Sequence, residues 1–362
     1  MSKPEFVRYS DDLEQPEAGE NEVIDQIIAS MTSESEKICQ RHGRAVRASH
    51  AKSTGLLKGE LRVLADLPEE LRQGLFAQAK SYPVVVRLAQ GPGELLKDSV
   101  STHRGLALKV LDVDGEKIVG HHDRTQDFVL ASGPVFPDAN AAAFLKSIKT
   151  LEKHSGKDDG LKHAVSTAAR LANNVLHAVG ADSAKLDFFG HPPRHPLSEP
   201  YYSQAPLRYG DYVAKIALFP MSEEAVALGD DALDTSDPDV FRHAVVDFFR
   251  RRGAEFELRV QLCVDLDKMP IEDASTEWPE DISAYRPVAR LVVPAQEAHS
   301  EQRASFFNER LSFRPAHSLA LHRPLGSLMR ARLKTYQVLA AFRQQRNNVQ
   351  PLEPISLGAI PD

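Results

Sequence analysis

The sequence predicts an α+β fold: an antiparallel β-barrel of about eight strands with helices packed around it. Short segments in which apolar and polar residues alternate come in two runs of four, and helical patterns separate the runs. A regular alternation of strand and helix is absent, which disfavours a doubly wound parallel sheet. The 362 residues, 42% hydrophobic and 26% charged, can supply one large core.

The expected helices flank the two runs of strands. Apolar residues at helical spacing predict a helix over residues 21–42. Asp66-Leu67-Pro68 predicts a short helix that continues to about residue 80, because proline favours the first helical turn. Further helices are expected over residues 138–180, which carry an apolar stripe from Leu161 to Val179, and over residues 236–253 and 325–346.

The clearest expected strand covers residues 256–264, where apolar residues alternate with Glu257, Arg259 and Gln261. Residues 188–210 hold five prolines and are expected to form a loop. The eight expected strands cover residues 57–64, 82–89, 105–113, 126–132, 212–219, 256–264, 287–293 and 304–313.

Composition and charge disfavour several classes of protein. The net charge of -7 argues against a general nucleic-acid-binding surface. The chain has no apolar run long enough for a membrane span, and residues 1–21 contain no apolar signal-peptide core. Two cysteines cannot form a disulfide framework for a chain of this size. We therefore expect a cytoplasmic protein with a flexible acidic arm (residues 1–20), one domain (21–350) and a short tail (351–362).

The most informative residues lie near opposite ends of the chain. Arg332, Tyr336 and Arg343 are four and seven positions apart, so they share one face of the last predicted helix. A guanidinium one turn away stabilises the phenolate form of a tyrosine, which can bind a ferric ion. Upstream, His50 follows Arg47, and a neutral imidazole can move a proton on a bound peroxide. Without further evidence, the commoner interpretations are that Tyr336 is a core residue beside a surface arginine and that His50 lies in an exposed loop.

Six segments, in the same order from about residue 40 to 345, resemble catalase motifs. The matches are R-V-V-H-A-K at residues 47–52, V-R-F at 86–88, P-R-G-F-A-V-K at 103–109, the end of the L-F-P stretch at 135–137, A-F-D-P at 312–315 and R-L-F-A-Y at 332–336. Six matches in register are far more specific than any one of them.

The resemblance implies a haem b protein with a catalase-like barrel. In that case His50 is the distal acid–base residue, Tyr336 is the axial ligand of the iron, and Arg332 supports the tyrosinate. The other matched positions imply contacts with the haem: Arg47, Arg87 and Arg343 pair with the propionates, and Phe136 packs on the porphyrin.

The departures from the catalase pattern concern the distal side. Asp123, followed by Arg124, stands nearest to the position of the distal asparagine, and an ionised carboxylate cannot donate a hydrogen bond. Ala89 replaces a distal serine, and Ser49 replaces a valine. The long N-terminal arm and the C-terminal domain of full-length catalases have no counterpart. The resemblance therefore implies a small, truncated relative with weak oxygen release.

The sequence thus predicts a haem peroxidase that acts on hydrogen peroxide or an organic hydroperoxide and takes electrons from a small organic reductant. Three alternatives remain: a hydroperoxide-rearranging enzyme of the allene oxide synthase type, a haem-binding protein without turnover, and a barrel that binds an apolar ligand without haem. No nucleic-acid partner and no membrane span are expected, and a homo-oligomer is compatible with the sequence.

Overall fold

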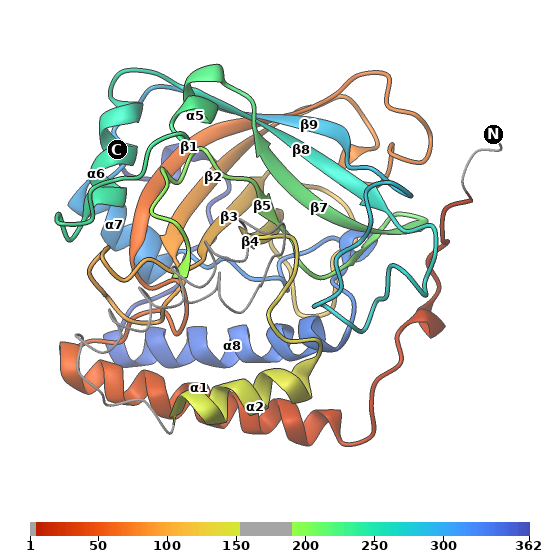
Figure 1. Ribbon diagram of the computed structural model, residues 1–362, viewed down its shortest axis with the longest axis horizontal. Coiled ribbons are helices and arrows are strands. Elements are labelled where there is room, and N and C mark those ends of the chain that lie inside the picture. Colours follow the sequence, from red (N-terminus) through yellow and green to blue (C-terminus); the bar gives the residue numbers. More distant parts are fainter. Residues whose placement is uncertain (1–4, 153–189) are drawn as a thin grey trace.

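A closed antiparallel barrel forms the centre of the computed structural model, which describes residues 5–152 and 190–362 (Figure 1). The predicted barrel of eight strands is confirmed. In spatial order its strands are β1 (Ser53–Val63), β2 (Ser81–Gln90), β3 (Arg104–Leu111), β4 (Thr125–Ser132), β5 (Tyr201–Tyr202), β7 (Tyr212–Pro220), β8 (Ala254–Leu262) and β9 (Arg286–Val293), which pairs again with β1. A short strand, β6 (Leu207–Tyr209), pairs with β7.

The alternating pattern of the strands fills the inside of this barrel. Residues two positions apart on a strand point to the same face, so each strand sends a row of apolar side chains inward. One core cluster unites such rows from strands far apart in the sequence, among them Val84, Val86 and Leu88 of β2, Leu106, Leu108 and Val110 of β3, and Leu258, Val260 and Leu262 of β8.

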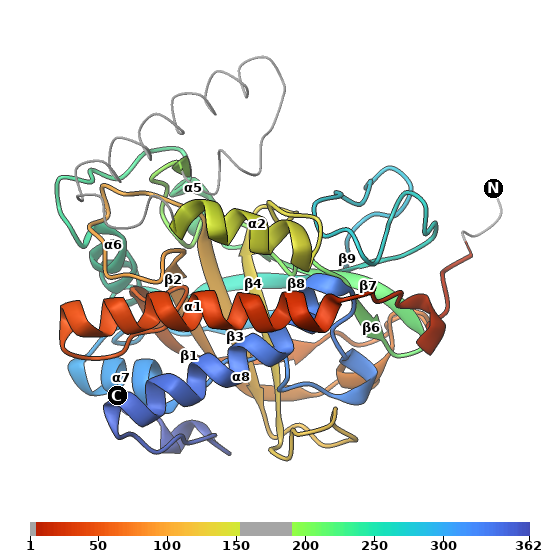
Figure 2. The same cartoon turned by 90° about the horizontal axis from the view of Figure 1, so that it is seen from below.

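Three helices form a layer beneath the barrel in Figure 1: α1 (Glu20–His42), α2 (Ala141–Glu152) and α8 (Ser327–Asn347). Figure 2 shows α1 between the other two. Ile24 and Ile27 of α1 pack with Ala141 of α2 and Ala331 of α8 in one buried cluster. Because α8 carries Tyr336, this layer fixes the position of that residue relative to the barrel.

The predicted helices over residues 21–42 and 325–346 are confirmed as α1 and α8. The helix predicted over residues 236–253 is shorter, α6 (Val240–Phe249), and a short α5 (Glu223–Ala227) precedes it. The described part of the 138–180 prediction is α2, whereas the apolar stripe from Leu161 to Val179 lies outside the described residues.

The helix predicted to follow Asp66 is wrong. That segment is made of turns and a short 3₁₀-helix, Gly74–Phe76. Asp66 and Gly74 adopt left-handed conformations, with φ of 57° and 52°. A right-handed helix cannot continue through such residues.

The strand predicted over residues 304–313 is also wrong. The segment forms α7 (Glu301–Ser305), which continues into a π-helical turn, Phe306–Arg310. Ser300 caps α7 by accepting a hydrogen bond from the backbone N of Arg303 at 3.1 Å. The eighth barrel strand is instead β5, in the segment predicted as a loop. Only two residues of β5 pair with its neighbours, too few to show a period of two.

Segments near both ends of the chain contact the barrel. The backbone N of Val7 donates to the carbonyl of Cys263 at 2.9 Å. At the other end, Ile360 packs beside Leu56, and Glu353 pairs with Lys109 at 2.6 Å. Within the described ranges, no helix combines the length and the apolar character that a membrane crossing requires.

Candidate functional site

Two adjoining cavities lie between α8 and one end of β2, β3 and β4. Their volumes are about 90 and 460 Å³. The residues that line both are Met31, Ser49, His50, Val129, Leu130 and Tyr336. The fold therefore brings His50 and Tyr336, predicted from opposite ends of the sequence, to the walls of one space.

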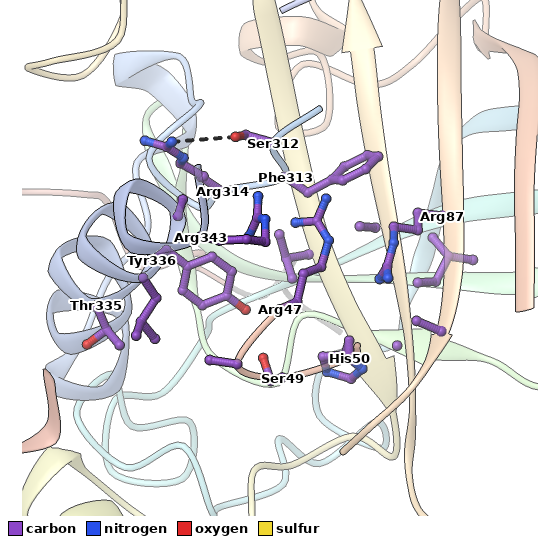
Figure 3. Close-up of a pocket in the computed structure, with 18 of the residues that line it drawn as sticks. Arg47, Ser49, His50, Arg87, Ser312, Phe313, Arg314, Thr335, Tyr336 and Arg343 are labelled. Atoms are coloured by element: carbon purple, nitrogen blue, oxygen red, sulfur yellow. Dashed lines mark hydrogen bonds between the residues drawn. The ribbon is translucent and has the colours of Figure 1, made fainter. Parts of the chain in front are cut away.

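Tyr336 extends from α8 into this space (Figure 3). One helical turn earlier, Nη2 of Arg332 donates a hydrogen bond to the Tyr336 hydroxyl at 3.2 Å. The guanidinium carbon of Arg332 also lies 5.4 Å from the centre of the Tyr336 ring. The helical spacing thus brings a cationic hydrogen-bond donor onto the phenol oxygen.

His50 lies against β3 in a strained position. Its φ is 53°, in the left-handed region. A Cβ added to Gly105 would lie 2.6 Å from the ring atoms Cε1 and Nδ1, so the ring occupies space that only glycine leaves open. The backbone N of His50 donates to the carbonyl of Gly91 at 2.9 Å. These constraints hold the imidazole at the cavity wall.

The environment of His50 keeps its imidazole neutral. Burial, and then the charges of His103 and Arg87, hold the pKa of His50 well below its ordinary value. The His103 ring meets it edge-on, with 5.4 Å between the ring centres. Among the described residues, the buried Nδ1 of His50 has no hydrogen-bond partner. Because Nδ1 is buried against the backbone of Gly105, Nε2 is the nitrogen that can reach a molecule in the cavity.

The three predicted arginines lie together in the first cavity (Figure 3). Arg47 donates from Nη2 to two backbone carbonyls of the 307–311 turn, at 2.6 and 2.8 Å. Arg87 donates to Asn308 Oδ1 at 3.0 Å. Burial, and then the charge of Arg343, lower the pKa of Arg47 well below its ordinary value and that of Arg87 to about 9. A group of buried cations at one end of a cavity favours an anionic ligand.

Sequence analysis missed a fourth arginine of this group, Arg314. It occupies the third position of the segment that resembles A-F-D-P, where catalases have an aspartate. This charge reversal was visible in the sequence. Its significance was not, because nothing local indicates that residue 314 lies beside Arg343.

The structure places the two remaining predicted residues very differently. Phe136 lines the second cavity and packs edge-on against Phe144 at 5.4 Å between ring centres. Asp123 is exposed and lines neither of these cavities. It lies beyond the far end of the β3–β4 hairpin. The pairing of these strands begins beside His50, where Gly105 faces Ala131, and ends six residues further along β3, where Leu111 faces Thr125. That separation is about 20 Å, so the structure does not bring Asp123 to the site.

Comparison with solved structures identifies the fold. No family model matches the chain, and no curated protein matches its sequence. Among solved structures, a fungal catalase matches with a TM-score of 0.61 and 18% identity, over 86% of this chain and 62% of that one. The chain has a catalase-like fold. A bacterial catalase matches with a TM-score of 0.56 and 16% identity, over 88% and 63% of the two chains. Catalase A from Saccharomyces cerevisiae matches with a TM-score of 0.58 and 16% identity, over 98% and 72%.

This chain therefore spans less than two thirds of the length of the fungal and bacterial catalases. At 16–18% identity, the likeness concerns the fold. The activity has to be argued from the residues of the two cavities.

Proposed function

We propose that the protein is a haem-dependent peroxidase that cleaves hydrogen peroxide or an organic hydroperoxide. One observation carries this proposal: His50, a buried neutral imidazole, and Tyr336, a phenol bonded to Arg332, line the same space. The catalase-like fold supports it.

The residues of the cavities suit haem b. The Tyr336 oxygen provides a ligand for ferric iron, and Arg332 donates a hydrogen bond to that oxygen. Phe136 and Leu130 provide apolar surface for the porphyrin ring. The buried guanidinium groups of Arg47 and Arg343 have nitrogen atoms without partners in the described structure, and these can bind propionates. Bound haem would supply the redox-active iron at which the peroxide O–O bond breaks.

His50 would perform the proton transfer of this reaction. Its neutral Nε2 accepts the proton from the peroxide and returns it to the oxygen that leaves, so that water or an alcohol departs when the O–O bond breaks. A neutral base is available at neutral pH because burial disfavours the imidazolium. Two electrons from a small organic reductant would then restore the starting oxidation state.

The proposal is tested with two variants and two matched controls. Tyr336→Phe should lose the ferric-tyrosinate absorption of the haem-loaded protein, whereas Tyr202→Phe, in the wall of the second cavity, should keep it. His50→Ala should retain haem but cleave peroxide about 10²–10⁴-fold more slowly in stopped flow. His122→Ala, at an exposed position, should match wild type.

An unchanged tyrosinate spectrum in Tyr336→Phe would overturn the ligand assignment. An unchanged cleavage rate in His50→Ala would overturn the acid–base assignment. Product analysis with a fatty-acid hydroperoxide separates the proposed reaction from rearrangement. A peroxidase consumes two electrons from the reductant and releases the alcohol, whereas an allene oxide synthase needs no reductant and releases the dehydrated epoxide.

A further inference from the structure

Four arginines line the first cavity, one more than the matched catalase positions provide: Arg87 and Arg343 are buried, and Arg47 and Arg314 are half-buried. We propose that Arg314 is a fourth carboxylate ligand, and that Arg87, Arg47, Arg343 and Arg314 together select an apolar, planar ligand with two free carboxylates. We call these four residues the arginine row. The inference rests on the proposed function for the identity of the ligand, a porphyrin, and adds the specificity of its binding site.

The arginine row is ordered across the cavity. In Figure 3 the guanidinium groups of Arg47 and Arg343 lie between Arg87 on the barrel side and Arg314 on the α8 side. The electrostatic effects follow the same order. Burial, and then the charge of Arg314, lower the pKa of Arg343 to about 10. Two neighbouring guanidinium groups are thus available for each of two carboxylates.

The row has no carboxylate within ion-pair distance among the described residues, although Glu353, Asp127 and Glu309 lie near enough to act on its charge. Atoms without a hydrogen-bond partner there include Nε of Arg47, Arg314 and Arg343, and Nη2 of Arg343. Cations removed from water without a paired anion are costly, so this end of the cavity suits an anion that the described chain does not supply.

The nearest carboxylates are engaged elsewhere. Asp127 and Glu353 both bind the buried Nζ of Lys109, at 2.7 and 2.6 Å. Glu309, at the end of the π-helical turn, pairs with Arg44. These acids moderate the positive charge around the arginine row without occupying its donors.

The loop that carries Arg314 is anchored while its side chain keeps donors to spare. The backbone N of Arg314 donates to Asp127 Oδ2 at 2.9 Å, and its Nη2 makes only a long contact with Ser312 Oγ at 3.4 Å. The catalase motif has an aspartate, with a charge of -1, at the position where this chain has Arg314, with a charge of +1. The arginine therefore changes the charge beside Arg343 by two units in favour of an anion.

The experiment uses an iron-free ligand so that Tyr336 does not contribute. The apoprotein is titrated with protoporphyrin IX, which has two free carboxylates, and with its dimethyl ester, which has none. Wild type should prefer the free acid. Loss of one charge-assisted contact should weaken free-acid binding by Arg314→Gln about 10- to 100-fold, and ester binding should not change. Arg314→Asp should bind the free acid still more weakly.

Matched variants make the result specific. Arg310→Gln, an exposed arginine four residues earlier, should bind both porphyrins as wild type does. Arg314→Lys keeps the charge but not the planar fork, so it should lose part of the free-acid affinity. Circular dichroism shows whether Arg314→Gln folds. If it does not fold, the affinity of Arg314→Lys provides the test in its place.

Two outcomes would overturn the inference alone. In the first, Arg314→Gln and Arg314→Lys bind the free acid as tightly as wild type while Arg343→Gln binds it weakly. In the second, Arg314→Gln loses the same affinity for acid and ester, which indicates a general packing role. If wild type binds neither porphyrin nor haem, the proposed function fails, and the inference fails with it.

Discussion

At the scale of single residues, Ala89 has no side-chain donor or acceptor to offer His50, whose buried Nδ1 has no hydrogen-bond partner among the described residues. Ala89 faces Gly105 directly in the β2–β3 register, and the His50 ring rests on Gly105. Cross-strand partners point to the same side of a sheet. A hydroxyl at position 89 would therefore lie close to the buried Nδ1 of His50.

Ala89→Ser should fix the imidazole with its proton on Nδ1 and leave Nε2 as the acceptor. A new hydrogen bond of this kind contributes about 1 kcal/mol to stability. We expect faster peroxide cleavage and a higher melting temperature than in wild type. Ala107→Ser, two residues further along β3 on the same face as Gly105, serves as the control. A slower or unchanged cleavage rate in Ala89→Ser would show that the hydroxyl does not reach His50.

Arg332→Ala should alter the proposed haem site while the fold stays intact. The change removes the 3.2 Å hydrogen bond to the Tyr336 hydroxyl and the only guanidinium bonded to it in the described structure. We expect weaker haem binding and a shifted tyrosinate absorption band. Lys334→Ala, exposed on the same helix, should leave both unchanged. Identical spectra for wild type and Arg332→Ala would remove the supporting role of Arg332.

Sequence could predict Arg332 and Tyr336 because helical spacing alone determines that their side chains meet. It could identify His50 through the motif around it. It could not place Asp123, because the register of the β3–β4 hairpin determines which end of the strand lies beside His50. It could not assign Arg314 either, since that residue meets Arg343 only through the packing of a loop against α8.

At the scale of secondary-structure elements, β3 is built to accommodate the His50 ring. Its second residue, Gly105, leaves the space that the ring fills. Gly105→Ala should displace the imidazole, because a methyl carbon at 2.6 Å is far inside van der Waals contact. We expect peroxide cleavage to fall toward the level of His50→Ala while far-UV circular dichroism is retained. Wild-type cleavage in this variant would show that the ring position is not needed.

Elements with long, regular patterns were predictable, and short or mixed ones were not. Strand β8 alternates over nine residues, and α8 is long and polar on one side. Strand β5 has two residues between proline-rich segments. Residues 304–313, where a strand was expected, lack such a pattern: Phe307, Leu311 and Phe313 stand at intervals of four and two. All three are buried in one cluster with Leu56, which a helical turn followed by a loop also achieves.

At the scale of the whole molecule, the fold depends on buried histidines that must stay neutral. His322 accepts a hydrogen bond on Nε2 from the backbone N of Leu75 at 2.9 Å, and His195 accepts one on Nδ1 from Leu197 at 3.2 Å. Burial lowers the pKa of each to about 4. A protonated ring could not accept these bonds.

The direction of the pH dependence follows from these shifts. An unfolded histidine titrates near 6.5, so below that pH the unfolded chain binds protons that the folded chain excludes. The stabilisation is present in full above pH 6.5 and is lost progressively as the pH falls toward 4. A shift of this size corresponds to at most about 3 kcal/mol for each histidine.

We therefore expect the free energy of unfolding, measured in urea, to fall steeply between pH 6.5 and 4. His322→Gln keeps an acceptor for the Leu75 backbone N but cannot be protonated, so its stability should depend less on pH in this window. His42→Gln, at the exposed end of α1, should follow the wild-type curve. If His322→Gln loses stability on acidification as steeply as wild type, the loss arises from other groups. In that case protonation of His322 does not cause the pH dependence of the free energy of unfolding.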